Sequence, residues 1–262
     1  MNLDKIGKQV IELTYNVAKY ILNERAIFIQ SKVEKKGFHD FVSYVDKQSE
    51  KQLVAGLKKI INNSGFITEE KTASNNNEDY IWIIDPLDGT TNFIHNLFPY
   101  AISIALQYKQ ETILGVVYEI GADEMFYSWS GEHAFCNNKK ISVTSVETMS
   151  EGLIATGFSI NDFERLNNHL KVVEEVIKNT HGLHRHGSAA TDLAYIAAGR
   201  FDGFFEYGLS VWDVAAGAFI VKQANGIVSD YSGKNNYLYG REIVVGTKNV
   251  HKDLLEILKR NM

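Results

Sequence analysis

Apolar side chains in the first sixty residues recur at steps of three and four, the spacing of one face of an α-helix. This spacing predicts a long amphipathic helix over the first ~30 residues, ended by Lys35, Lys36 and Gly37. The residues that share its apolar face are Ile6, Val10, Leu13, Val17, Tyr20 and Ile21. A short extended segment is expected at 41–45, after which Asp46 would cap a second amphipathic helix. The apolar face of that second helix consists of Leu53, Leu57, Ile60 and Ile61.

The pattern then changes to that of β-strands. Residues 66–68 predict a short strand that ends at Glu69 and Glu70. The β-prone run 80–84 predicts a buried strand, which Pro86 would stop because proline has no backbone N–H to donate. Three further strands joined by short turns, at 101–108, 112–119 and 124–129, predict an antiparallel meander.

After residue 150, short apolar runs alternate with helical patterns. Strands are expected at 153–156, 183–186, 201–206, 227–229 and 242–246. Helices are expected at 162–178, 188–198, 213–223 and 250–259. This alternation is typical of layered α/β packing, and no proline-rich tether precedes it. We therefore expect one domain, with an α+β half at about 1–148 and an α/β half at about 149–262.

The composition is that of an ordinary globular protein, with 45% hydrophobic residues, 23% charged residues and a net charge of −5. The lack of a basic excess argues against nucleic acid as the main partner. Cys136 is the only cysteine, which excludes an intrachain disulfide and a cysteine-based zinc site. Charges are interleaved through residues 1–25, so neither a signal peptide nor a membrane helix is expected. We expect a soluble, cytoplasmic protein.

Acidic residues recur at the ends of the predicted elements. They are Glu69, Glu70, Asp85, Asp88 and Asp213. Any one of them alone would more often cap a helix or face water. Beside Asp88, however, the run Gly89-Thr90-Thr91-Asn92 can open a helix whose free N–H groups bind an anion. Because Mg²⁺ takes oxygen ligands and shares them with substrate phosphates, the combination indicates a site for magnesium and phosphate.

Three segments resemble the motifs of the inositol monophosphatase family. They are Thr68-Glu69-Glu70, the run Trp-Ile-Ile-Asp-Pro-Leu-Asp-Gly-Thr-Thr-Asn-Phe from Trp82 to Phe93, and Trp212-Asp213-Val-Ala-Ala-Gly. The resemblance continues through 187–190, 197–200 and 202–206. Asn225-Gly226 stands where relatives usually have Gly-Gly, and since Asn tolerates left-handed backbone angles we expect the same turn shape. The resemblance implies a layered α-β-α-β-α sandwich and a Mg²⁺-dependent phosphomonoesterase.

The same resemblance implies a set of metal ligands. Glu69, Asp85 and the backbone carbonyl of Leu87 would hold a first Mg²⁺. Asp85, which would bridge the two ions, would hold a second together with Asp88 and Asp213. A third, weaker ion would bind near Glu69. This arrangement is that of two-metal hydrolysis.

Catalytic and substrate-binding roles also follow from the resemblance. Asp85 would take part in catalysis as the bridging ligand, and Glu69 and Thr90 would orient the attacking water or take its proton. N–H groups of Gly89 and Thr90 would bind the phosphate, and Glu206 would accept a hydrogen bond from a substrate hydroxyl. Arg185 could reach a phosphate or a subunit interface. The other substrate-binding positions implied are Leu87, Asp88, Gly187, Ser188, Ala189 and Asp213.

The resemblance makes myo-inositol 1-phosphate, or a similar small sugar or polyol phosphate, the first candidate substrate. The alternatives are the 2′-phosphate of NADP(H), a phosphoadenosine phosphate and fructose 1,6-bisphosphate, because specificity lies in loops rather than in the shared metal motif. A non-catalytic regulator that binds RNA polymerase or RNA, as reported for some bacterial relatives, is the alternative of a different class, and the intact ligand motifs argue against it. Relatives are often homodimers and lithium-sensitive, so both properties are expected here.

Three further motifs have simpler interpretations. His181, His184 and His186 resemble a metal-binding tract, but no acidic or cysteine partner lies nearby in the sequence, which favours a structural or interface role over zinc. Ser188 beside His186 lacks the Gly-x-Ser-x-Gly elbow of serine hydrolases. Cys136 is expected to be a small buried hydrophobe. Neither a P-loop nor a Gly-x-Gly-x-x-Gly fingerprint occurs.

Overall fold

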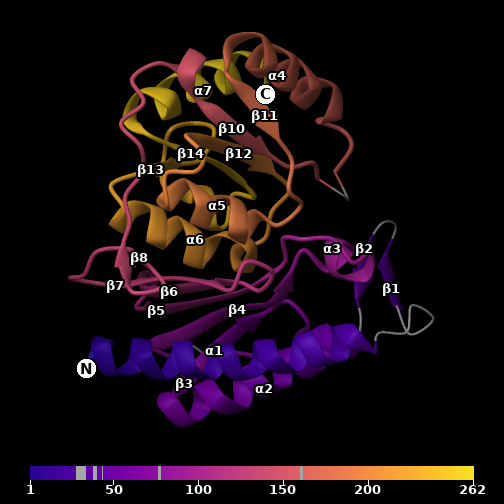
Figure 1. The fold of residues 1–262 in the computed structure, drawn as a ribbon, viewed down its shortest axis with the longest axis vertical. Helices are drawn as coiled ribbons and strands as arrows, with labels where there is room; N and C mark the ends of the chain where they lie inside the picture. Colours follow the sequence, from indigo (N-terminus) through magenta and orange to yellow (C-terminus); the bar gives the residue numbers. More distant parts are fainter. Residues whose placement is uncertain (28–33, 38–39, 43, 76–77, 160–161) are drawn as a thin grey trace.

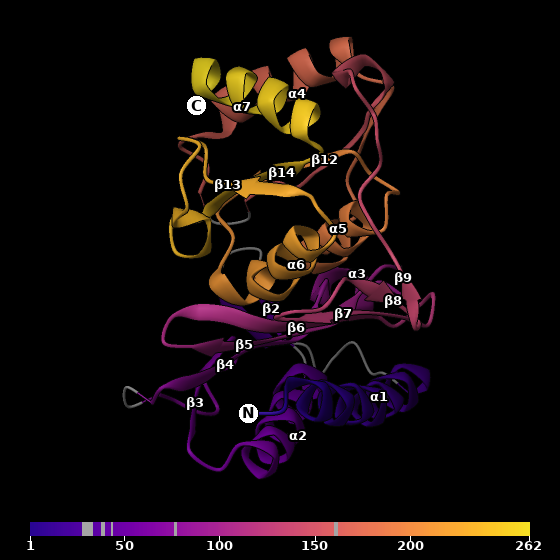
Figure 2. The ribbon, with the colours of Figure 1, turned by 90° about the vertical axis from the view of Figure 1, so that its left-hand side faces the viewer.

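Five layers of secondary structure form the molecule. The computed structural model describes residues 1–27, 34–37, 40–42, 44–75, 78–159 and 162–262. Figures 1 and 2 show a helix pair, a large sheet, a second helix pair, a smaller sheet and a third helix pair, stacked in this order. The order confirms the expected α-β-α-β-α sandwich. Among the helices described, none combines the length and the apolar character that a membrane span requires.

The first helix pair and the large sheet come from the N-terminal part of the chain. α1 (Leu3–Ala26) and α2 (Tyr44–Ile60) cover one face of a seven-stranded sheet (Figure 1). Its strands are β3 (Ser64–Thr68), β4 (Tyr80–Asp88), β5 (Ala101–Tyr108), β6 (Glu111–Glu119), β7 (Glu124–Trp129), β8 (Phe135–Cys136) and β9 (Lys139–Lys140). β3 and β4 are parallel and β5, β6 and β7 are antiparallel neighbours, which confirms the meander. A separate antiparallel pair consists of β1 (Glu34–Gly37) and β2 (Asp40–Val42).

The C-terminal part supplies the other three layers. α5 (Ala189–Ala197) and α6 (Val211–Gln223) lie between the two sheets, while α4 (Leu166–Asn179) and α7 (Lys248–Asn261) cover the outer face (Figure 2). The smaller sheet has the order β11–β10–β12–β14–β13. Its strands are β10 (Leu153–Thr156), β11 (Gly182–His184), β12 (Gly203–Tyr207), β13 (Ile227–Ser229) and β14 (Glu242–Gly246). Short 3₁₀ turns occur at Met149–Glu151 and Asn236–Leu238.

Alternation along the strands divides the interior into three cores. In β4, Ile83 faces the central core around α5 and α6, whereas Trp82 and Ile84 face α1 and α2. In β12, Phe204 faces the same central core, whereas Phe205 faces α4 and α7. Neighbouring side chains on a strand point to opposite faces, so each sheet is buried on both sides and joins two layers.

Small residues allow α6 to lie very close to the large sheet. A Cβ atom on Gly115 of β6 would lie 2.7 Å from the carbonyl oxygen of Ala216 in α6, so a larger residue has no room here. At the start of the same helix, Ser103 of β5 donates a hydrogen bond to the carbonyl oxygen of Trp212 at 3.1 Å. These contacts place Asp213 against the ends of the central strands.

Two boundaries near the N-terminus differ from the predictions. The first helix ends at Ala26, and residues 35–37, which were predicted to end it, belong to β1 (Glu34–Gly37). The extended segment predicted at 41–45 is confirmed only for Phe41 and Val42, because β2 ends at Val42 and Tyr44 already opens α2 (residue 43 lies outside the described residues). Asp46 is therefore inside the first helical turn and does not cap it.

The prediction that Pro86 stops its strand is wrong as well. β4 continues to Asp88, with a shift of register between the pairs Asp85–Ser103 and Asp88–Ala101. Pro86 falls within this irregularity, where a strand can lack a ladder donor. A bulge close to the end of β4, rather than termination of the strand at Pro86, presents Asp85 and Asp88.

Candidate active site

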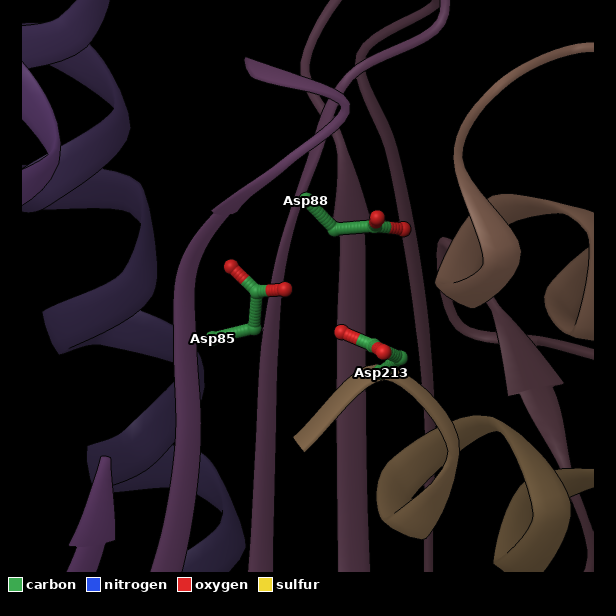
Figure 3. A group of neighbouring side chains, drawn as sticks. All are labelled: Asp85, Asp88 and Asp213. Carbon is green, nitrogen blue, oxygen red and sulfur yellow. The ribbon is translucent and has the colours of Figure 1, made fainter. Parts of the chain in front are cut away.

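Three aspartates converge at the junction of the large sheet and α6. Carboxylate oxygens of Asp85, Asp88 and Asp213 all lie within 4.8 Å of one another. Figure 3 shows their carboxyl groups turned toward a common centre, two from the end of β4 and one from the first turn of α6. Asp85 is only 2% exposed. A set of oxygen donors at this spacing, one buried and two partly buried, is suited to a divalent cation such as Mg²⁺.

The bulge in β4 explains why Asp85 and Asp88 face the same side. Residues three apart on a regular strand point to opposite faces. Between the pairs Asp85–Ser103 and Asp88–Ala101, β4 has one residue more than β5, and this extra residue restores a common direction. The backbone N–H of Leu87 donates to Asp85 Oδ1 at 2.9 Å and so fixes the first carboxyl group.

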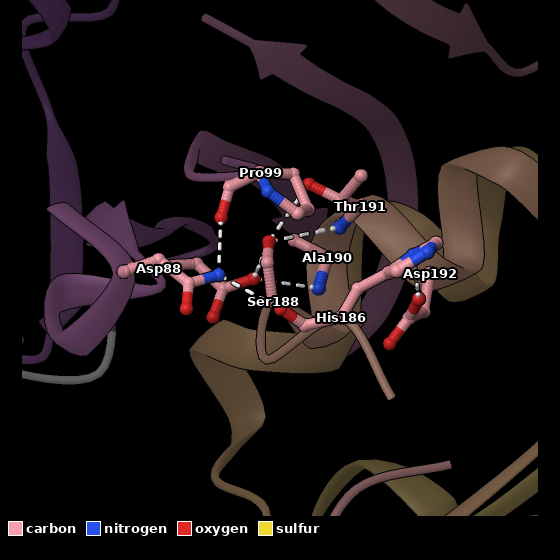
Figure 4. A network of polar contacts seen from close by, with 8 residues as sticks. Asp88, Pro99, His186, Ser188, Ala190, Thr191 and Asp192 are labelled. Carbon is pink, nitrogen blue, oxygen red and sulfur yellow. Dashed lines mark hydrogen bonds and ion pairs between the residues drawn. The ribbon is translucent and has the colours of Figure 1, made fainter. Parts of the chain in front are cut away.

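Asp88 is held by the N-terminus of α5. Its Oδ2 accepts hydrogen bonds from Ser188 Oγ and from the backbone N–H of Ala190, each at 2.7 Å (Figure 4). Ser188 is the N-cap of α5. Nearby, Asn92 Nδ2 donates to the carbonyl oxygen of His186 at 2.8 Å. These bonds join the motif at 82–93 to the C-terminal half and fix the carboxyl group of Asp88.

Asp213 takes its position from the helix start. α6 begins at Val211 with Ser210 as N-cap, so the helix starts two residues before the predicted start at 213 and Asp213 lies in its first turn. Asp213 Oδ2 accepts a hydrogen bond from the backbone N–H of Ser210 at 2.6 Å, the return bond of a capping box. This bond holds the carboxyl group toward Asp85 and Asp88.

The surroundings of the three carboxyl groups make their charged forms unfavourable. Burial, followed by the charges of Glu69, Asp88 and Asp213, raises the pKa of Asp85 well above its usual range. Burial and the charge of Asp213 raise the pKa of Asp88 to about 7. Burial also raises the pKa of Asp213 to about 6. Carboxyl groups with pKa values raised in this way are stabilised in their charged form by a cation placed among them.

Glu69 stands beside the three aspartates. It follows β3, and its backbone N–H donates to the carbonyl oxygen of Ile84 at 3.3 Å, which aligns it with the end of β4. Its charge contributes to the raised pKa of Asp85. The structure thus brings all three predicted acidic segments to one place.

Thr90 opens the short helix α3 (Thr90–Ile94). Gly89 precedes it with φ +88°, a left-handed angle that favours glycine. The hydroxyl of Thr90 lies 2.8 Å from Asp46 Oδ1 and 3.0 Å from the carbonyl oxygen of Leu87. A hydroxyl has a single hydrogen, so one of these two oxygens receives it.

Asp46 is a residue that the sequence analysis did not assign to the site. The signal for it was available: Asp46 and Glu50 continue the apolar stripe of Leu53 and Leu57 along α2, at steps of four, three and four. Both acids are fully buried. An acid on the buried face of an amphipathic helix requires hydrogen-bond partners inside the protein, and this requirement could have pointed to the site.

A pocket of 340 Å³ lies over the cluster. Nine of the predicted residues line it: Glu69, Asp88, Gly89, Thr90, Gly187, Ser188, Ala189, Glu206 and Asp213. Asp85 and Leu87 do not line the pocket, and both are buried, so the side chain of Leu87 is not a pocket contact. On the wall of the pocket, burial followed by the charge of Asp192 raises the pKa of Glu206 well above its usual range.

Two arginines also line this pocket. Arg241 Nη2 donates to the carbonyl oxygen of Gly208 at 2.7 Å, and the guanidinium of Arg185 lies 5.9 Å from the ring centroid of Phe158. Of the two alternatives for Arg185, its place in the pocket favours contact with a ligand. A larger hollow of 890 Å³ beside α1 contains none of the predicted site residues.

The histidine tract has an acidic partner that the sequence analysis overlooked. His186 Nδ1 lies 3.0 Å from Asp192 Oδ1, and this hydrogen bond raises the pKa of His186 (Figure 4). β11 ends at His184, whose ring centroid lies 5.7 Å from that of His186. Within the described part of the chain, neither histidine belongs to a group of three metal ligands.

The remaining motifs have structural explanations. The hydroxyl of Ser188 bonds to Asp88 and Thr191 and makes no bond to His186 among the described contacts. Cys136 packs against the central core as the expected small hydrophobe, but it is only half-buried. Asn225 has φ +67°, which confirms the left-handed turn expected there.

Comparison with known proteins gives matches over almost the whole chain. A model of the inositol monophosphatase family matches residues 2–262. The chain is 38% identical over 235 residues to the Nus factor SuhB of Pseudomonas aeruginosa, covering 88% of this chain and 87% of that protein. It is similar to the crystal structure of the extragenic suppressor protein suhB from Bartonella henselae, with a TM-score of 0.92, 33% identity and coverage of 97% and 98% of the two chains. The inositol monophosphatase from Anabaena has a TM-score of 0.87, 28% identity and coverage of 100% and 98%.

Proposed function

Because this chain belongs to the inositol monophosphatase family, we propose that it is a Mg²⁺-dependent phosphomonoesterase. The observation that carries this proposal is the convergence of Asp85, Asp88 and Asp213 beneath a pocket that Glu69 and Thr90 also line. All the donors are oxygen atoms, the ligands that Mg²⁺ prefers. The raised pKa values of the three aspartates support the presence of a cation in the working protein.

We propose the following ligand sets. Glu69, Asp85 and the carbonyl oxygen of Leu87 would hold a first Mg²⁺, and Asp85, Asp88 and Asp213 a second. A third, weaker ion near Glu69 is consistent with the acidic character of that side of the pocket. When bound, these ions supply positive charge to the phosphoryl oxygens and lower the pKa of water.

The protein's own groups would then orient the nucleophile. The hydroxyl of Thr90 has its single hydrogen engaged by Asp46 or by Leu87, so its oxygen can accept a hydrogen bond from an attacking water. Glu69 would accept the second proton of that water and act as general base. The backbone N–H groups of Gly89 and Thr90, at the start of α3, would bind the phosphate.

The wall opposite the cluster would hold the alcohol part of the substrate. Glu206 lines the pocket together with Gly187, Ser188 and Ala189, and its carboxyl group can bond to a substrate hydroxyl in either protonation state. A volume of 340 Å³ lies near the lower end of the ~300–1,000 Å³ that ligand pockets span. A pocket of this size accommodates myo-inositol 1-phosphate or a similar polyol or sugar phosphate.

The test is a phosphate-release assay on the purified chain with and without Mg²⁺. The substrate panel comprises myo-inositol 1-phosphate, NADP, phosphoadenosine phosphate and fructose 1,6-bisphosphate. We expect Mg²⁺-dependent release, fastest with the inositol phosphate. Faster release from one of the other three would change the substrate within the same mechanism. No release from any compound of the panel would contradict the phosphatase proposal.

A second candidate function comes from the relatives. One protein that is 38% identical to this chain is named a Nus factor, which favours a role as a regulator that binds RNA polymerase or RNA. This role requires no hydrolysis and can also exist beside it. Co-purification of RNA polymerase with a tagged Asp213→Asn variant would support it, because that variant retains the surface while losing the proposed chemistry.

Three expectations from the family resemblance remain predictions: a homodimer, inhibition by lithium and a cytoplasmic location. Light scattering on the purified chain tests the first. Inhibition of phosphate release by lithium but not by an equal concentration of potassium tests the second. Fractionation of the source cells tests the third.

A further inference from the structure

α2 carries a second buried acid that the proposed mechanism does not use. Glu50 lies one helical turn after Asp46, and residues four apart share one face of a helix. Both are completely buried. Asp46 Oδ1 lies 2.8 Å from the hydroxyl oxygen of Thr90, so this face of α2 is directed at the proposed active site.

Glu50 binds the segment that follows Glu69. Its Oε2 accepts a hydrogen bond from the backbone N–H of Glu70 at 2.7 Å. Its Oε1 accepts two more from Thr72, from the backbone N–H at 2.8 Å and from the hydroxyl at 2.7 Å. Within the described part of the chain these three donors are its partners, and no cationic side chain is paired with it. The carboxylate therefore closes the turn after β3 in the way that a bound anion would.

These bonds restrain Glu69 from one side while the sheet restrains it from the other. The backbone N–H of Glu69 donates to Ile84 of β4 at 3.3 Å, and the next N–H along the chain, that of Glu70, donates to Glu50. Glu69 is thus the residue at which the chain passes from the strand to the turn bound by α2. Its φ and ψ angles are set from both directions.

We propose that Glu50 is a positioning residue that places Glu69 for metal binding and for orientation of the attacking water. Asp46 contacts Thr90, and Glu50 binds the turn that follows Glu69. Because both acids lie on the same helix, their spacing would fix the distance between Thr90 and Glu69, the two groups proposed to orient the attacking water. This inference rests on the proposed phosphatase function for the roles of Glu69 and Thr90. The hydrogen bonds of Glu50 themselves do not depend on it.

The variant Glu50→Gln tests the proposal with little change of shape. One oxygen of the carboxylate becomes an NH₂ group, which cannot accept a hydrogen bond. With the amide oxygen toward Thr72, the NH₂ group faces the N–H of Glu70, so two donors oppose each other next to Glu69. Loss of a residue that orients a metal ligand costs about 10- to 100-fold in metal affinity or activity.

Glu119→Gln is the matched control. Glu119 is 1% exposed, and its two carboxylate oxygens accept backbone N–H groups of Gly121 and Ala122 in a turn. The same donor–donor conflict arises there, but Glu119 does not line the proposed site. Any loss of stability caused by the conflict alone is therefore common to both variants.

Two readouts decide the question: the Mg²⁺ affinity measured by calorimetry, and the dependence of kcat and substrate KM on Mg²⁺. We expect Glu50→Gln to bind Mg²⁺ about 10- to 100-fold more weakly and to lose kcat, with substrate KM nearly unchanged at saturating Mg²⁺. Glu119→Gln should match the wild type in both readouts. Equal behaviour of the two variants would overturn the proposal.

A milder variant covers the case in which Glu50→Gln does not fold. Thr72→Val keeps the branched shape and the backbone N–H but removes the hydroxyl that donates to Glu50. We expect a smaller weakening of Mg²⁺ affinity in the same direction, and no weakening would contradict the proposal. If the wild type releases no phosphate at all, the phosphatase proposal is wrong, while the calorimetric comparison still decides whether Glu50 positions a metal ligand.

Discussion

Asp213 is the residue by which α6 of the C-terminal half joins Asp85 and Asp88 of β4 in the acidic cluster. We predict that Asp213→Asn lowers kcat at least about a hundredfold and raises the Mg²⁺ concentration needed for half-maximal activity, because one charged ligand of the second ion is lost. The fold should survive, since an amide oxygen can still accept the hydrogen bond from Ser210 and one repelling charge is removed.

Phosphate release measured across a Mg²⁺ titration checks this prediction, with circular dichroism as a test of folding. Asp4→Asn on the exposed side of α1 is the control for a general effect of charge. Near-full Mg²⁺-dependent activity of Asp213→Asn would show that this carboxylate is not a ligand.

From the burial of His169 on α4 we predict a dependence of stability on pH that does not involve the acidic cluster. Burial, with the charge of Arg165, lowers the pKa of His169 to about 4. The imidazole lies among aromatic rings, with centroids 5.1 Å from Phe158, 5.4 Å from Phe205 and 5.3 Å from Tyr207. An unfolded histidine has a pKa of about 6.5, so below that pH the unfolded chain binds the extra proton and the folded chain does not.

The free energy of unfolding should therefore fall by on the order of 2 kcal/mol, because of this residue, when the pH is lowered from about 7 to about 4.5. His169→Phe fits the same ring environment and cannot be protonated, so its free energy of unfolding should fall less over that range. Urea denaturation at both pH values measures the difference. The control is His133→Phe, at an exposed position, which should show the wild-type pH dependence. If the free energy of unfolding falls equally in His169→Phe and in the wild type, His169 is not the source of the pH dependence.

At the scale of the elements, the strands were predicted best. The ranges 153–156, 227–229 and 242–246 coincide with β10, β13 and β14. Short apolar runs between turn-forming residues carry this information locally. The meander of β5 to β7 was predicted for the same reason, since each strand pairs with its neighbour in sequence.

Helix starts and the bulge were predicted less well, for two different physical reasons. The segment Ser210-Val-Trp-Asp213 has the spacing of a capping box, so the start of α6 could have been read from the sequence. Pro86 is different, because only the partner strand β5 shows that β4 resumes after it. A rule based on the local sequence cannot contain that long-range pairing.

The residues of the candidate site likewise divide into those that the local sequence predicts and those that depend on contacts between distant segments. The residues that carry the family motifs, such as Asp85 and Asp213, were found because each motif is continuous in sequence. Asp46 was missed because its partner Thr90 is 44 residues away, and Glu50 was missed because its partners are 20 and 22 residues away. Hydrogen bonds between remote elements depend on the packing of α2 against the sheet.

At the scale of the whole molecule, the acidic cluster joins the N-terminal and C-terminal parts of the chain. Asp85 and Asp88 belong to the large sheet, and Asp213 belongs to α6 from the C-terminal half. A cation bound by all three would therefore resist separation of the halves. Ligands that bind only the folded state raise its stability, so we predict that Mg²⁺ raises the temperature of unfolding and that a chelator lowers it.

The size of this effect should depend on pH. The folded pKa values of Asp88 and Asp213 are raised to about 7 and about 6, above the value of about 4 for an unfolded aspartate. The metal-free folded state therefore holds protons that the unfolded state has released, and its stability falls as pH rises through this range. Bound Mg²⁺ offsets the same charges, so the difference in melting temperature between Mg²⁺ and EDTA should be larger at about pH 8 than at about pH 6.

Calorimetric scans in both buffers at both pH values measure this difference. Groups such as His169 that titrate alike in the two buffers contribute equally to both melting temperatures, so their contribution cancels in the difference. Asp213→Asn should reduce the pH dependence, and a difference that is the same at both pH values would show that these aspartates do not carry the buried charge that Mg²⁺ offsets.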